Sequence, residues 1–318
     1  MQRVLIVKTT SMGDLVHALP ALTDISRAFP GVRIDWVAED VFAAIPALHP
    51  AVDTVIPVAI RRWRKKWWHA DVREEWKHCR QRLASTPYDA VIDLQGLIKS
   101  AWVARHANGP LHGPDWRSAR DGTASLFYQY KHRVPYAQSA VVRARGLCAA
   151  ALGYSVDGPP VFGLSVDAPA GMPAAYAALL PSTSRDEKMW SEAHWQQVIA
   201  QLLSQGLTPV VFSGNDDELA RAKRLLQGAS GGLALAKMSL KAAAQILGHA
   251  RVIIGVDTGL THLGAALGRP VIGLYTDSDP AMVPVTGDGP IVCLGGPQQS
   301  PTVEQLLAEL DRVMAVSR

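Results

Sequence analysis

Short runs of consecutive apolar residues alternate with helical patterns along the whole chain. The runs AVIDL, PVVF, RVIIGV and PVIGLY lack the apolar–polar alternation of a strand with one solvated face. Such runs are typical of parallel sheets that helices cover on both faces. Because 318 residues exceed the usual size of one hydrophobic core, the sequence predicts two doubly wound α/β domains that face each other across a cleft. Ligands of such sheets bind beyond the carboxyl ends of the strands.

A Gly- and Pro-rich stretch at residues 153–173 interrupts the alternation and is typical of a linker between domains. We place the first domain at residues 1–167 and the second at 168–318, with a C-terminal helix that either closes the second domain or crosses back to the first. Strands are expected near residues 3–9, 33–38, 54–58, 89–95, 176–182, 208–213, 233–236, 251–256 and 270–275. Helices are expected near residues 15–28, 67–84, 97–106, 137–152, 191–205, 216–227, 240–248, 259–267 and 302–315.

The composition indicates a folded protein of the cytoplasm. The chain is 48% hydrophobic, its mean hydropathy is +0.07, and no apolar run approaches the roughly 20 residues that span a bilayer. The first residues lead into a strand without the apolar core of a signal peptide. Cys79, Cys148 and Cys293 lie far apart, without metal-type spacing, which indicates free thiols in a reducing compartment.

The turn after the first strand has the position of a phosphate-binding loop, yet it carries an acid. In VLIVKTTSMGDLVHALPAL, residues 4–22, an apolar strand is followed by Gly13, Asp14 and an apolar-periodic helix. Glycines in such a turn allow backbone N–H groups and a helix N-terminus to hold a phosphate. A carboxylate would repel that phosphate, so Asp14 indicates either a helix N-cap or a proton acceptor for chemistry in the cleft.

A strand-to-helix turn in the second half is suited to a diphosphate. In GVDTGLTHLGAAL, residues 255–267, Asp257 is positioned to act as N-cap, and Thr258 and Gly259 open a helix. Free backbone N–H groups and the Thr258 hydroxyl form an anion cradle there. His262 lies four residues after Thr258 and shares its side of the helix. The alternative is a well-capped helix on which His262 is only a surface residue.

Three further segments follow strands of the second half. PSTSRDEKMWSEAHW, residues 181–195, offers hydroxyls and Lys188 to phosphate oxygens, or is a polar loop with a helix cap. FSGNDDELARAKRL, residues 212–225, places Glu218 where it could bind a nucleoside, or is a solvated helix start. TDSDP, residues 276–280, contains a DxD pattern that can hold a divalent ion, but an ordinary Asp-Pro turn is the favoured interpretation.

The basic segment RRWRKK, residues 61–66, has five bases in six residues and is followed by Trp67 and Trp68. Such a segment suits nucleic acid, an anionic membrane surface or a multiply anionic acceptor. A solvated basic helix face is the alternative. Trp63, Trp67, Trp68 and Trp76 favour a binding role, because exposed tryptophan is unusual without an apolar or interfacial partner.

These segments together resemble the bacterial lipopolysaccharide heptosyltransferases, the inverting glycosyltransferases of family 9. In chain order they are VKTTSMGDLVHALPALTD, VIPVAIRRWRKKWW, YDAVIDLQGLIKSA, HGPDW, STSRDEKMW, KMSL and VDTGLTHLGAALGRP. The resemblance runs from residue 2 to about residue 280. It implies two facing Rossmann-like domains of GT-B architecture, with the active site in the interdomain cleft. The RRWRKKW segment and the TTSMGD loop look most like members that add the first heptose to the Kdo region on lipid A.

The resemblance implies a role for each matching position. Asp14 falls on the catalytic base. Donor-binding contacts fall on Thr183, Ser184, Lys188, Glu218, Met238, Asp257, Thr258, Gly259 and His262. Acceptor-binding contacts fall on Lys8, Arg61, Arg62, Arg64, Lys65, Arg120 and His132. Two positions depart from the family pattern: residue 184 is Ser where a second Thr is expected, and the YTDSDP loop replaces a Gly-Pro-Thr-Asp-Pro pattern.

The implied reaction is inverting transfer of L-glycero-D-manno-heptose from ADP-heptose to Kdo-lipid A at the cytoplasmic face of the inner membrane. The sequence has no obvious metal cage, and Lys188, His262 and the helix dipole are suited to neutralise the leaving diphosphate, so we predict chemistry without a metal and with no cofactor besides the donor. A related heptosyltransferase with a different acceptor, like the second enzyme of the core, is one alternative. A nucleic-acid-binding or anionic-polymer-binding α/β protein is another, although no nucleic-acid motif accompanies the basic cluster. A dehydrogenase would need a G-x-G-x-x-G loop after the first strand.

Overall fold

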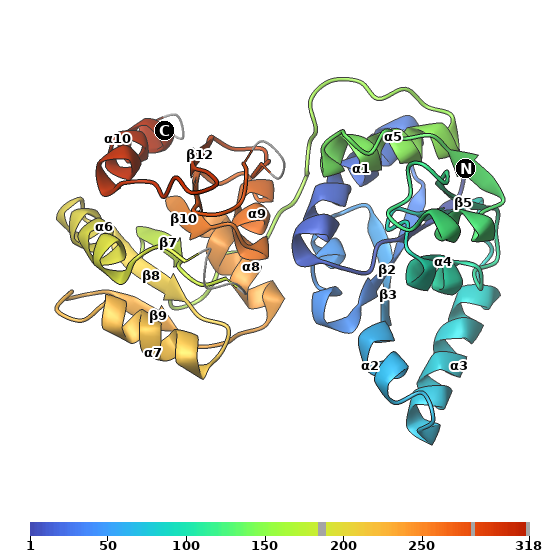
Figure 1. Ribbon diagram of the computed structural model, residues 1–318, viewed down its shortest axis with the longest axis horizontal. Coiled ribbons are helices and arrows are strands. Elements are labelled where there is room, and N and C mark those ends of the chain that lie inside the picture. The colour runs from blue at the N-terminus through green and yellow to red at the C-terminus, as the bar shows by residue number, and fades with distance from the viewer. Residues whose placement is uncertain (184–188, 281–283, 316–318) are drawn as a thin grey trace. The chain divides into compact units, whose positions relative to one another are not determined.

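The chain forms two compact units, which we call unit 1 (Met1–Gly163) and unit 2 (Leu164–Arg318). The computed structural model describes residues 1–183, 189–280 and 284–315 (Figure 1). The division between the units falls inside the Gly- and Pro-rich stretch 153–173. Each unit contains a six-stranded sheet, and the paired strands of both sheets run parallel. This confirms the predicted class of two parallel-sheet α/β domains.

Unit 1 begins with a strand and alternates strands with helices. Its strands are β1 (Arg3–Val7), β2 (Arg33–Glu39), β3 (Val52–Val58), β4 (Ala90–Asp93), β5 (Leu111–Pro114) and β6 (Tyr130–His132). Its α-helices are α1 (Met12–Ala28), α2 (Ile60–Lys65), α3 (Ala70–Ser85), α4 (Ile98–Ala104) and α5 (Ala140–Leu152). Short 3-10 helices cover Asp40–Phe42, Pro46–Leu48 and Gly122–Phe127. The strands lie in the order β3-β2-β1-β4-β5-β6.

Unit 2 repeats the same plan after the linker. Its strands are β7 (Tyr176–Leu180), β8 (Thr208–Phe212), β9 (Leu233–Leu235), β10 (Val252–Val256), β11 (Val271–Tyr275) and β12 (Ile291–Gly295). Its helices are α6 (Glu192–Ser204), α7 (Asp216–Leu225), α8 (Leu240–His249), α9 (Gly259–Ala266) and α10 (Val303–Ala315). The strands lie in the order β12-β11-β10-β7-β8-β9.

Both strand orders are that of a doubly wound Rossmann fold. The first strand of each unit lies in the middle of its sheet: β1 pairs with β2 and β4, and β7 pairs with β8 and β10. The direction of winding therefore reverses between β1 and β4, and again between β7 and β10. Loops that leave neighbouring strands in opposite directions open a crevice beyond their carboxyl ends. The residues that follow these four strands are thus placed to bind ligands.

Burial follows the position of each strand in its sheet. The central strands β1, β4, β7, β10 and β11 are buried almost throughout, because helices cover both of their faces. Fully burying one Val, Leu or Ile side chain stabilises a fold by about 1.5–3 kcal/mol. The edge strands β3 and β12 are partly exposed. Pro57 lies in the edge strand β3, where a residue without a backbone N–H does not interrupt the hydrogen bonds between central strands.

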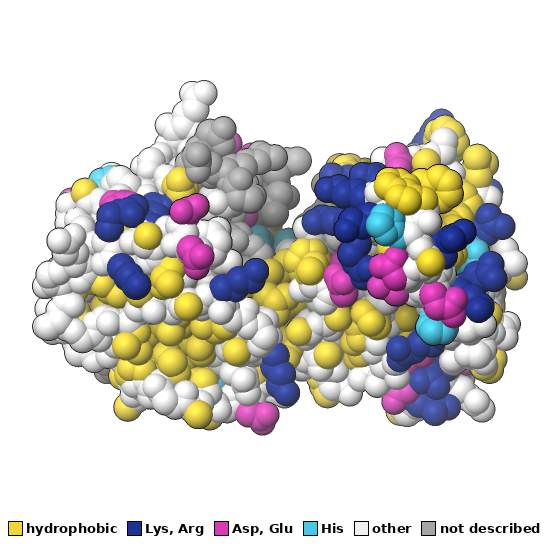
Figure 2. Space-filling view, turned by 90° about the horizontal axis from the view of Figure 1, so that it is seen from below, with side chains coloured by type: hydrophobic (Ala, Val, Ile, Leu, Met, Phe, Trp, Pro, Cys, Tyr) yellow, Lys and Arg dark blue, Asp and Glu magenta, His cyan; other side chains and the backbone are white. Residues whose placement is uncertain are grey.

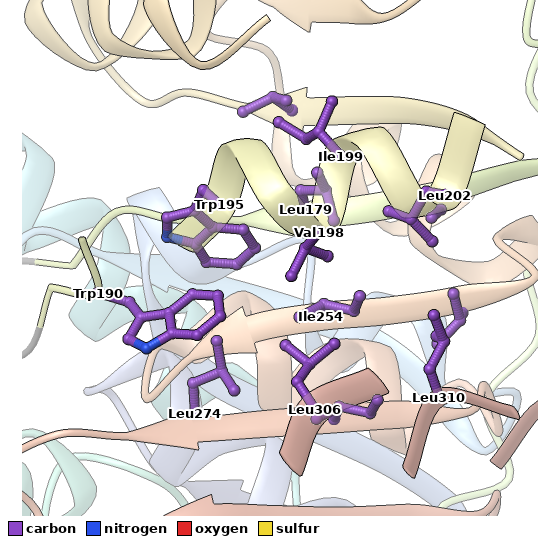
Figure 3. Packing of buried hydrophobic residues seen from close by; sticks show 14 of the residues in the cluster. Leu179, Trp190, Trp195, Val198, Ile199, Leu202, Ile254, Leu274, Leu306 and Leu310 are labelled. Carbon is purple, nitrogen blue, oxygen red and sulfur yellow. The ribbon is translucent and has the colours of Figure 1, made fainter. Parts of the chain in front are cut away.

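The core of unit 2 includes the C-terminal helix (Figure 3). Leu306 and Leu310 of α10 pack with Leu274 and Ile254 of the sheet, and Trp190 and Trp195 close the cluster from the start of α6. Trp190 Nε1 donates a hydrogen bond to the carbonyl of Pro301, just before α10, at 2.8 Å. The α10 helix is therefore part of the core of unit 2.

Several elements differ from the sequence-based expectation. The strands β5, β6 and β12 were not predicted: β5 reads LHGP, whose glycine and proline resemble a turn, and β6 and β12 are edge strands with mixed burial. The expected helix 67–84 begins instead at Ala70. The basic segment before it forms the separate helix α2.

Candidate active site

Asp14 lies at the start of α1, directly after the loop that follows β1. The N-cap of α1 is Ser11, so Asp14 is the third helical residue and the N-cap interpretation of Asp14 is wrong. Its Oδ2 atom accepts hydrogen bonds from the backbone N–H and the hydroxyl of Ser11, both at 2.9 Å. An acid at this position that bonds back to the N-cap residue forms a capping box. Asp14 therefore stabilises the helix start through one oxygen.

The second oxygen of Asp14 faces a half-buried cation. Lys8 Nζ lies 4.0 Å from Asp14 Oδ1 and donates a hydrogen bond to the carbonyl of Leu94 at 3.1 Å. Burial raises the pKa of Asp14, but the Lys8 charge and the Ser11 hydrogen bonds outweigh it, so the net pKa is lowered. Burial lowers the pKa of Lys8 against the opposing effect of Asp14 and Asp93. The electrostatics thus favour a carboxylate at residue 14.

The loop after β4 holds the Asp14 loop in place. Gln95 Oε1 accepts hydrogen bonds from the backbone N–H groups of Thr9 and Thr10, at 2.9 and 3.1 Å. Lys99 Nζ donates to the Thr10 hydroxyl at 3.3 Å. The loop itself is fixed by buried Asp93, which accepts from the N–H of Gln95 at 2.8 Å and from other groups around it. Loops from both central strands therefore meet at the switch point of unit 1.

A small cavity of about 80 Å³ opens beside Asp14. The Asp14 carboxylate lines it together with the cations Lys8, Arg120 and Arg143. Among the described residues, Asp14 is the only acidic side chain in the lining of this cavity. Arg143 Cζ lies 4.1 Å from the centre of the Tyr136 ring, and its Nε atom is buried without a hydrogen-bond partner. One proton acceptor surrounded by cations suits a substrate that carries anionic groups beside a hydroxyl.

The basic segment forms α2, and its cationic side chains make different contacts. Arg61, Arg62, Arg64 and Lys65 are all exposed. Arg62 Nη2 pairs with Glu75 Oε2 of α3 at 2.8 Å, and the same carboxylate accepts from Trp63 Nε1 at 2.7 Å. Arg62 therefore fastens α2 to α3. Arg64 instead lines an apolar groove that it shares with Lys99 and several tryptophans.

The other two predicted acceptor residues, Arg120 and His132, lie in different parts of unit 1. Arg120 lines the Asp14 cavity. His132 ends the edge strand β6 and stacks on His112, with 3.0 Å between His132 Nε2 and His112 Nδ1. Burial lowers the pKa of both rings. His132 is absent from the lining residues of the Asp14 cavity in the described part of unit 1.

In unit 2 the predicted donor residues Asp257, Thr258, Gly259 and His262 follow the carboxyl end of β10. The N-cap of α9 is Thr258 rather than Asp257, because Asp257 is engaged elsewhere: its Oδ2 accepts from the Ser278 hydroxyl at 2.8 Å and its Oδ1 lies 3.4 Å from His262 Nε2. His262 is only 3% exposed, so the alternative of a surface histidine is wrong. The Thr258 side chain makes no capping hydrogen bond to the helix, and N–H groups at a helix N-terminus are suited to an anion.

The remaining donor candidates are distributed over unit 2. Glu218 closes a capping arrangement at the start of α7, where its carboxylate accepts from the N–H of Gly214 and the amide of Asn215 at 2.8 and 2.9 Å. Met238 is half-buried between β9 and α8, and Thr183 is half-buried after β7. Ser184 and Lys188 lie outside the described residues. Gly259 is the first residue of α9.

The described residues contain neither a cluster of metal ligands nor a helix that could span a membrane. No group of three or more His, Cys, Asp or Glu side chains is arranged to hold a metal ion in residues 1–183, 189–280 and 284–315. Asp277 and Asp279 of the DxD pattern are exposed, and Ser278 between them bonds to Asp257. Over the same residues no helix has the length and apolar character of a membrane span.

Three residues of the unit 1 site were missed by sequence reasoning. Gln95 and Lys99 lie in the segment YDAVIDLQGLIKSA, and their positions just after a buried strand were a usable signal. Arg143 lies within the predicted helix 137–152, where nothing in the sequence distinguishes it from the nearby Arg145. Its place beside Asp14 follows from the packing of α1 against α5, which only the tertiary structure shows.

Known proteins resemble this chain over nearly its whole length. Lipopolysaccharide heptosyltransferase 1 of Escherichia coli strain K12 is 47% identical over 303 residues, which cover 92% of this chain and 93% of that relative. Two solved structures of the E. coli heptosyltransferase WaaC, one with ADP and one with ADP-2-deoxy-2-fluoro heptose, match with TM-scores of 0.91 and 0.88 at 43% identity, covering 98% of this chain and 99% of each. The model of glycosyltransferase family 9 (heptosyltransferase) matches residues 76–310. A chain with this fold, these site residues and this similarity belongs to glycosyltransferase family 9, the heptosyltransferases.

Proposed function

We propose that the protein transfers L-glycero-D-manno-heptose from ADP-heptose to the Kdo region of Kdo-lipid A, with inversion at the anomeric carbon. The observation that carries this proposal is the Asp14 carboxylate, which lies at the switch point of unit 1 among Lys8, Arg120 and Arg143. An acceptor made of a sugar acid and phosphates offers a hydroxyl to the carboxylate and anionic groups to the cations. The similarity to heptosyltransferase 1 supports the same acceptor.

Unit 1 is the acceptor-binding domain in this proposal. The acceptor hydroxyl attacks the anomeric carbon of the heptose, and Asp14 Oδ1 removes its proton as the new C–O bond forms. The bond from the anomeric carbon to the diphosphate oxygen breaks, and ADP leaves with the electron pair. A positioned general base contributes roughly 10²–10⁴-fold to such a step. Lys8 keeps Asp14 ionised before the acceptor arrives.

Unit 2 is the donor-binding domain. The free N–H groups at the start of α9 and the Thr258 hydroxyl bind the diphosphate, where the helix dipole favours negative charge. His262, held near Asp257, lies one turn further along the same helix face. Glu218 and Met238 contact the nucleoside, and Thr183, Ser184 and Lys188 complete the heptose and diphosphate side. The WaaC structures with ADP and with a fluorinated ADP-heptose support this donor.

The protein works at the cytoplasmic face of the inner membrane as a peripheral protein, because its acceptor is a lipid. Exposed Arg61, Arg64 and Lys65 of α2 and exposed Trp67 and Trp68 are suited to an anionic lipid surface. Nucleic acid is not a partner in this proposal.

The test is a product assay with the purified protein, ADP-heptose and Kdo-lipid A. We expect stoichiometric release of ADP and a mass gain of one heptose on the acceptor. A matched reaction with an acceptor that already carries the first heptose separates this activity from that of a second heptosyltransferase. Transfer only to the heptose-bearing acceptor would contradict the proposed acceptor. Transfer to neither would contradict the proposed function as a whole.

A further inference from the structure

A groove rich in tryptophan lies on unit 1 beside α2, α3 and the start of α4. It has a volume of about 710 Å³, and its apolar lining includes Trp63, Trp67, Trp76, Leu97, Ile98 and Trp102. A water molecule occupies about 30 Å³ of liquid, and a methylene group is of similar size, so the groove has room for roughly two dozen such groups. It is large enough for a hydrocarbon chain.

The floor of the groove is a stack of indole rings. Trp76 and Trp102 stack with centroids 4.3 Å apart and planes 22° apart, and Trp63 meets the edge of Trp76 at 5.7 Å. These contacts hold the rings in fixed positions, yet Trp102 is 39% exposed and Trp67 is 67% exposed. Contiguous apolar surface of this kind marks a binding site in a soluble domain.

Basic side chains surround the apolar floor. Arg64, Arg73 and Lys99 line the groove, and the acid Asp121 is also part of the lining. Burial lowers the pKa of Lys99, and the nearby charges of Arg61, Arg64 and Arg120 lower it further, against the opposing charge of Glu39. Figure 2 shows dark blue Lys and Arg side chains gathered next to yellow hydrophobic ones on this unit. The surface therefore complements a molecule that is both apolar and anionic.

The lining of the groove includes residues of the segment that contacts the Asp14 loop. Leu97, Ile98 and Lys99 line the groove, whereas Leu94 and Gln95 of the same loop line the Asp14 cavity. Lys99 Nζ bonds to the Thr10 hydroxyl at 3.3 Å, four residues before Asp14. A ligand whose apolar part lies on the tryptophans therefore has its charged part beside the loop that carries the base.

We propose that this groove binds one acyl chain of the lipid acceptor, with the anionic headgroup at the Lys99 end. The inference rests on the proposed function, which makes the acceptor a lipid, and adds a site for the part of the acceptor that does not react. Binding of a remote, non-reacting part positions the reacting group. The groove then selects acylated over deacylated acceptors.

The kinetic test compares acylated and deacylated Kdo-lipid A with wild-type protein and Trp102→Ala. We expect Trp102→Ala to raise the KM for the acylated acceptor by about tenfold, because stacked apolar contact to the chain is lost. The KM for the deacylated acceptor and the KM for ADP-heptose should change less than about twofold. Trp102→Phe, which keeps an aromatic ring on Trp76, should restore most of the affinity. Trp116→Ala removes a more exposed tryptophan (58% exposed) that lies outside the groove lining, and it serves as the control.

A binding test without catalysis uses dodecyl phosphate as the probe. Calorimetry should detect binding to the wild-type protein with a negative heat-capacity change, which reports apolar burial. Binding should weaken about tenfold in Trp102→Ala and stay unchanged in Trp116→Ala. Inorganic phosphate alone should bind far more weakly than dodecyl phosphate, because it lacks the chain.

The outcomes separate the two proposals. Equal KM values for both acceptors in the wild type, with no effect of Trp102→Ala on either, would overturn the acyl-chain site and leave the heptosyl transfer intact. Absence of transfer to either acceptor would overturn the proposed function, while the dodecyl phosphate result would still decide whether the groove binds an alkyl chain. If Trp102→Ala loses binding to anionic phospholipid vesicles but keeps the KM for detergent-dispersed acceptor, the groove is a membrane-docking surface and the acyl-chain proposal is wrong.

Discussion

At the scale of single residues, the two oxygens of Asp14 have different surroundings. Oδ2 is taken by the N–H and hydroxyl of Ser11, and Oδ1 lies toward Lys8 at 4.0 Å. The same side chain therefore stabilises the start of α1 and offers an oxygen to the cavity. The two roles are separable because an amide oxygen accepts a hydrogen bond as a carboxylate does but is not a useful base.

Asp14→Asn tests this separation. The amide keeps the shape and one acceptor for the Ser11 N–H, so the melting temperature should fall little. Without a base, kcat should fall by roughly 10²–10⁴-fold while the affinity for ADP-heptose stays the same. Steady-state kinetics, donor binding by calorimetry and a thermal melt measure the three quantities. Activity within a few-fold of wild type would show that Asp14 is not the base.

Lys8 should set the acid limb of the pH–rate profile. Burial raises the pKa of Asp14, and the Lys8 charge is the largest effect that lowers it. In Lys8→Met this charge is gone, so the pKa of Asp14 rises and the acid limb of kcat/KM moves to higher pH. The limb moves up because the base must be ionised, and a higher pKa keeps it protonated over a wider range. Lys77→Met, which removes an exposed lysine of α3, should leave the limb in place. An unmoved limb in Lys8→Met would contradict the coupling.

At the scale of elements, a buried ion pair holds α1, α5 and the start of the linker together. Arg145 of α5 makes two hydrogen bonds to Asp24 of α1, at 2.7 and 3.1 Å, and both side chains are almost fully buried. The guanidinium also donates to the carbonyls of Gly158 and Asp157. Since α1 carries Asp14 and α5 carries Arg143, this pair fixes the two sides of the Asp14 cavity.

Asp24→Ala should therefore be strongly destabilising. It leaves the guanidinium buried without its carboxylate, which typically costs about 3–5 kcal/mol. The double variant Asp24→Leu with Arg145→Met removes both charges and should recover much of that loss. Urea unfolding, followed by a probe in unit 1, gives the free energies. A loss in Asp24→Ala no larger than that of an exposed pair, about 0–1 kcal/mol, would mean that the pair is solvated.

At the scale of the whole molecule, the proposed function assigns the two substrates to separate units. Each unit has its own sheet and its own hydrophobic core. The proposed donor contact Thr258 and the proposed acceptor contacts Arg61 and Arg64 share no hydrogen-bond partner among the described residues. Substitutions in the two groups should then act on different substrates.

A double-mutant cycle measures this independence. Thr258→Ala should weaken ADP-heptose binding by about 1.5–3 kcal/mol, the value of a hydrogen bond to a charged group. Arg61→Glu with Arg64→Glu should raise the KM of the acceptor, more so at low ionic strength where repulsion is less screened. The combined variant should show both effects with additive free energies, because independent sites without shared partners add within about 0.5 kcal/mol. A large coupling term would show that donor and acceptor sites depend on each other.

Much of the fold was predictable because central strands of parallel sheets have a distinctive composition. Runs such as VLIV, AVID and VIIGV are apolar on both faces, and the elements around them appear where expected. The strands β5, β6 and β12 were not predicted, because a short strand with Gly and Pro, or an edge strand with one solvated side, has no such pattern.

The sequence by itself determined the fold class, the turn that carries Asp14 and the turn that carries Thr258, because strand burial and helix starts depend on neighbouring residues. Only the tertiary structure decided which distant residues join them. The burial of His262 and the approach of Lys99 to Thr10 depend on contacts between segments far apart in the chain. The tryptophan groove is of the same kind, since Trp63, Trp76 and Trp102 come from three helices. Local patterns record which residues are apolar or basic, but the packing of helices on the sheet decides which of them meet.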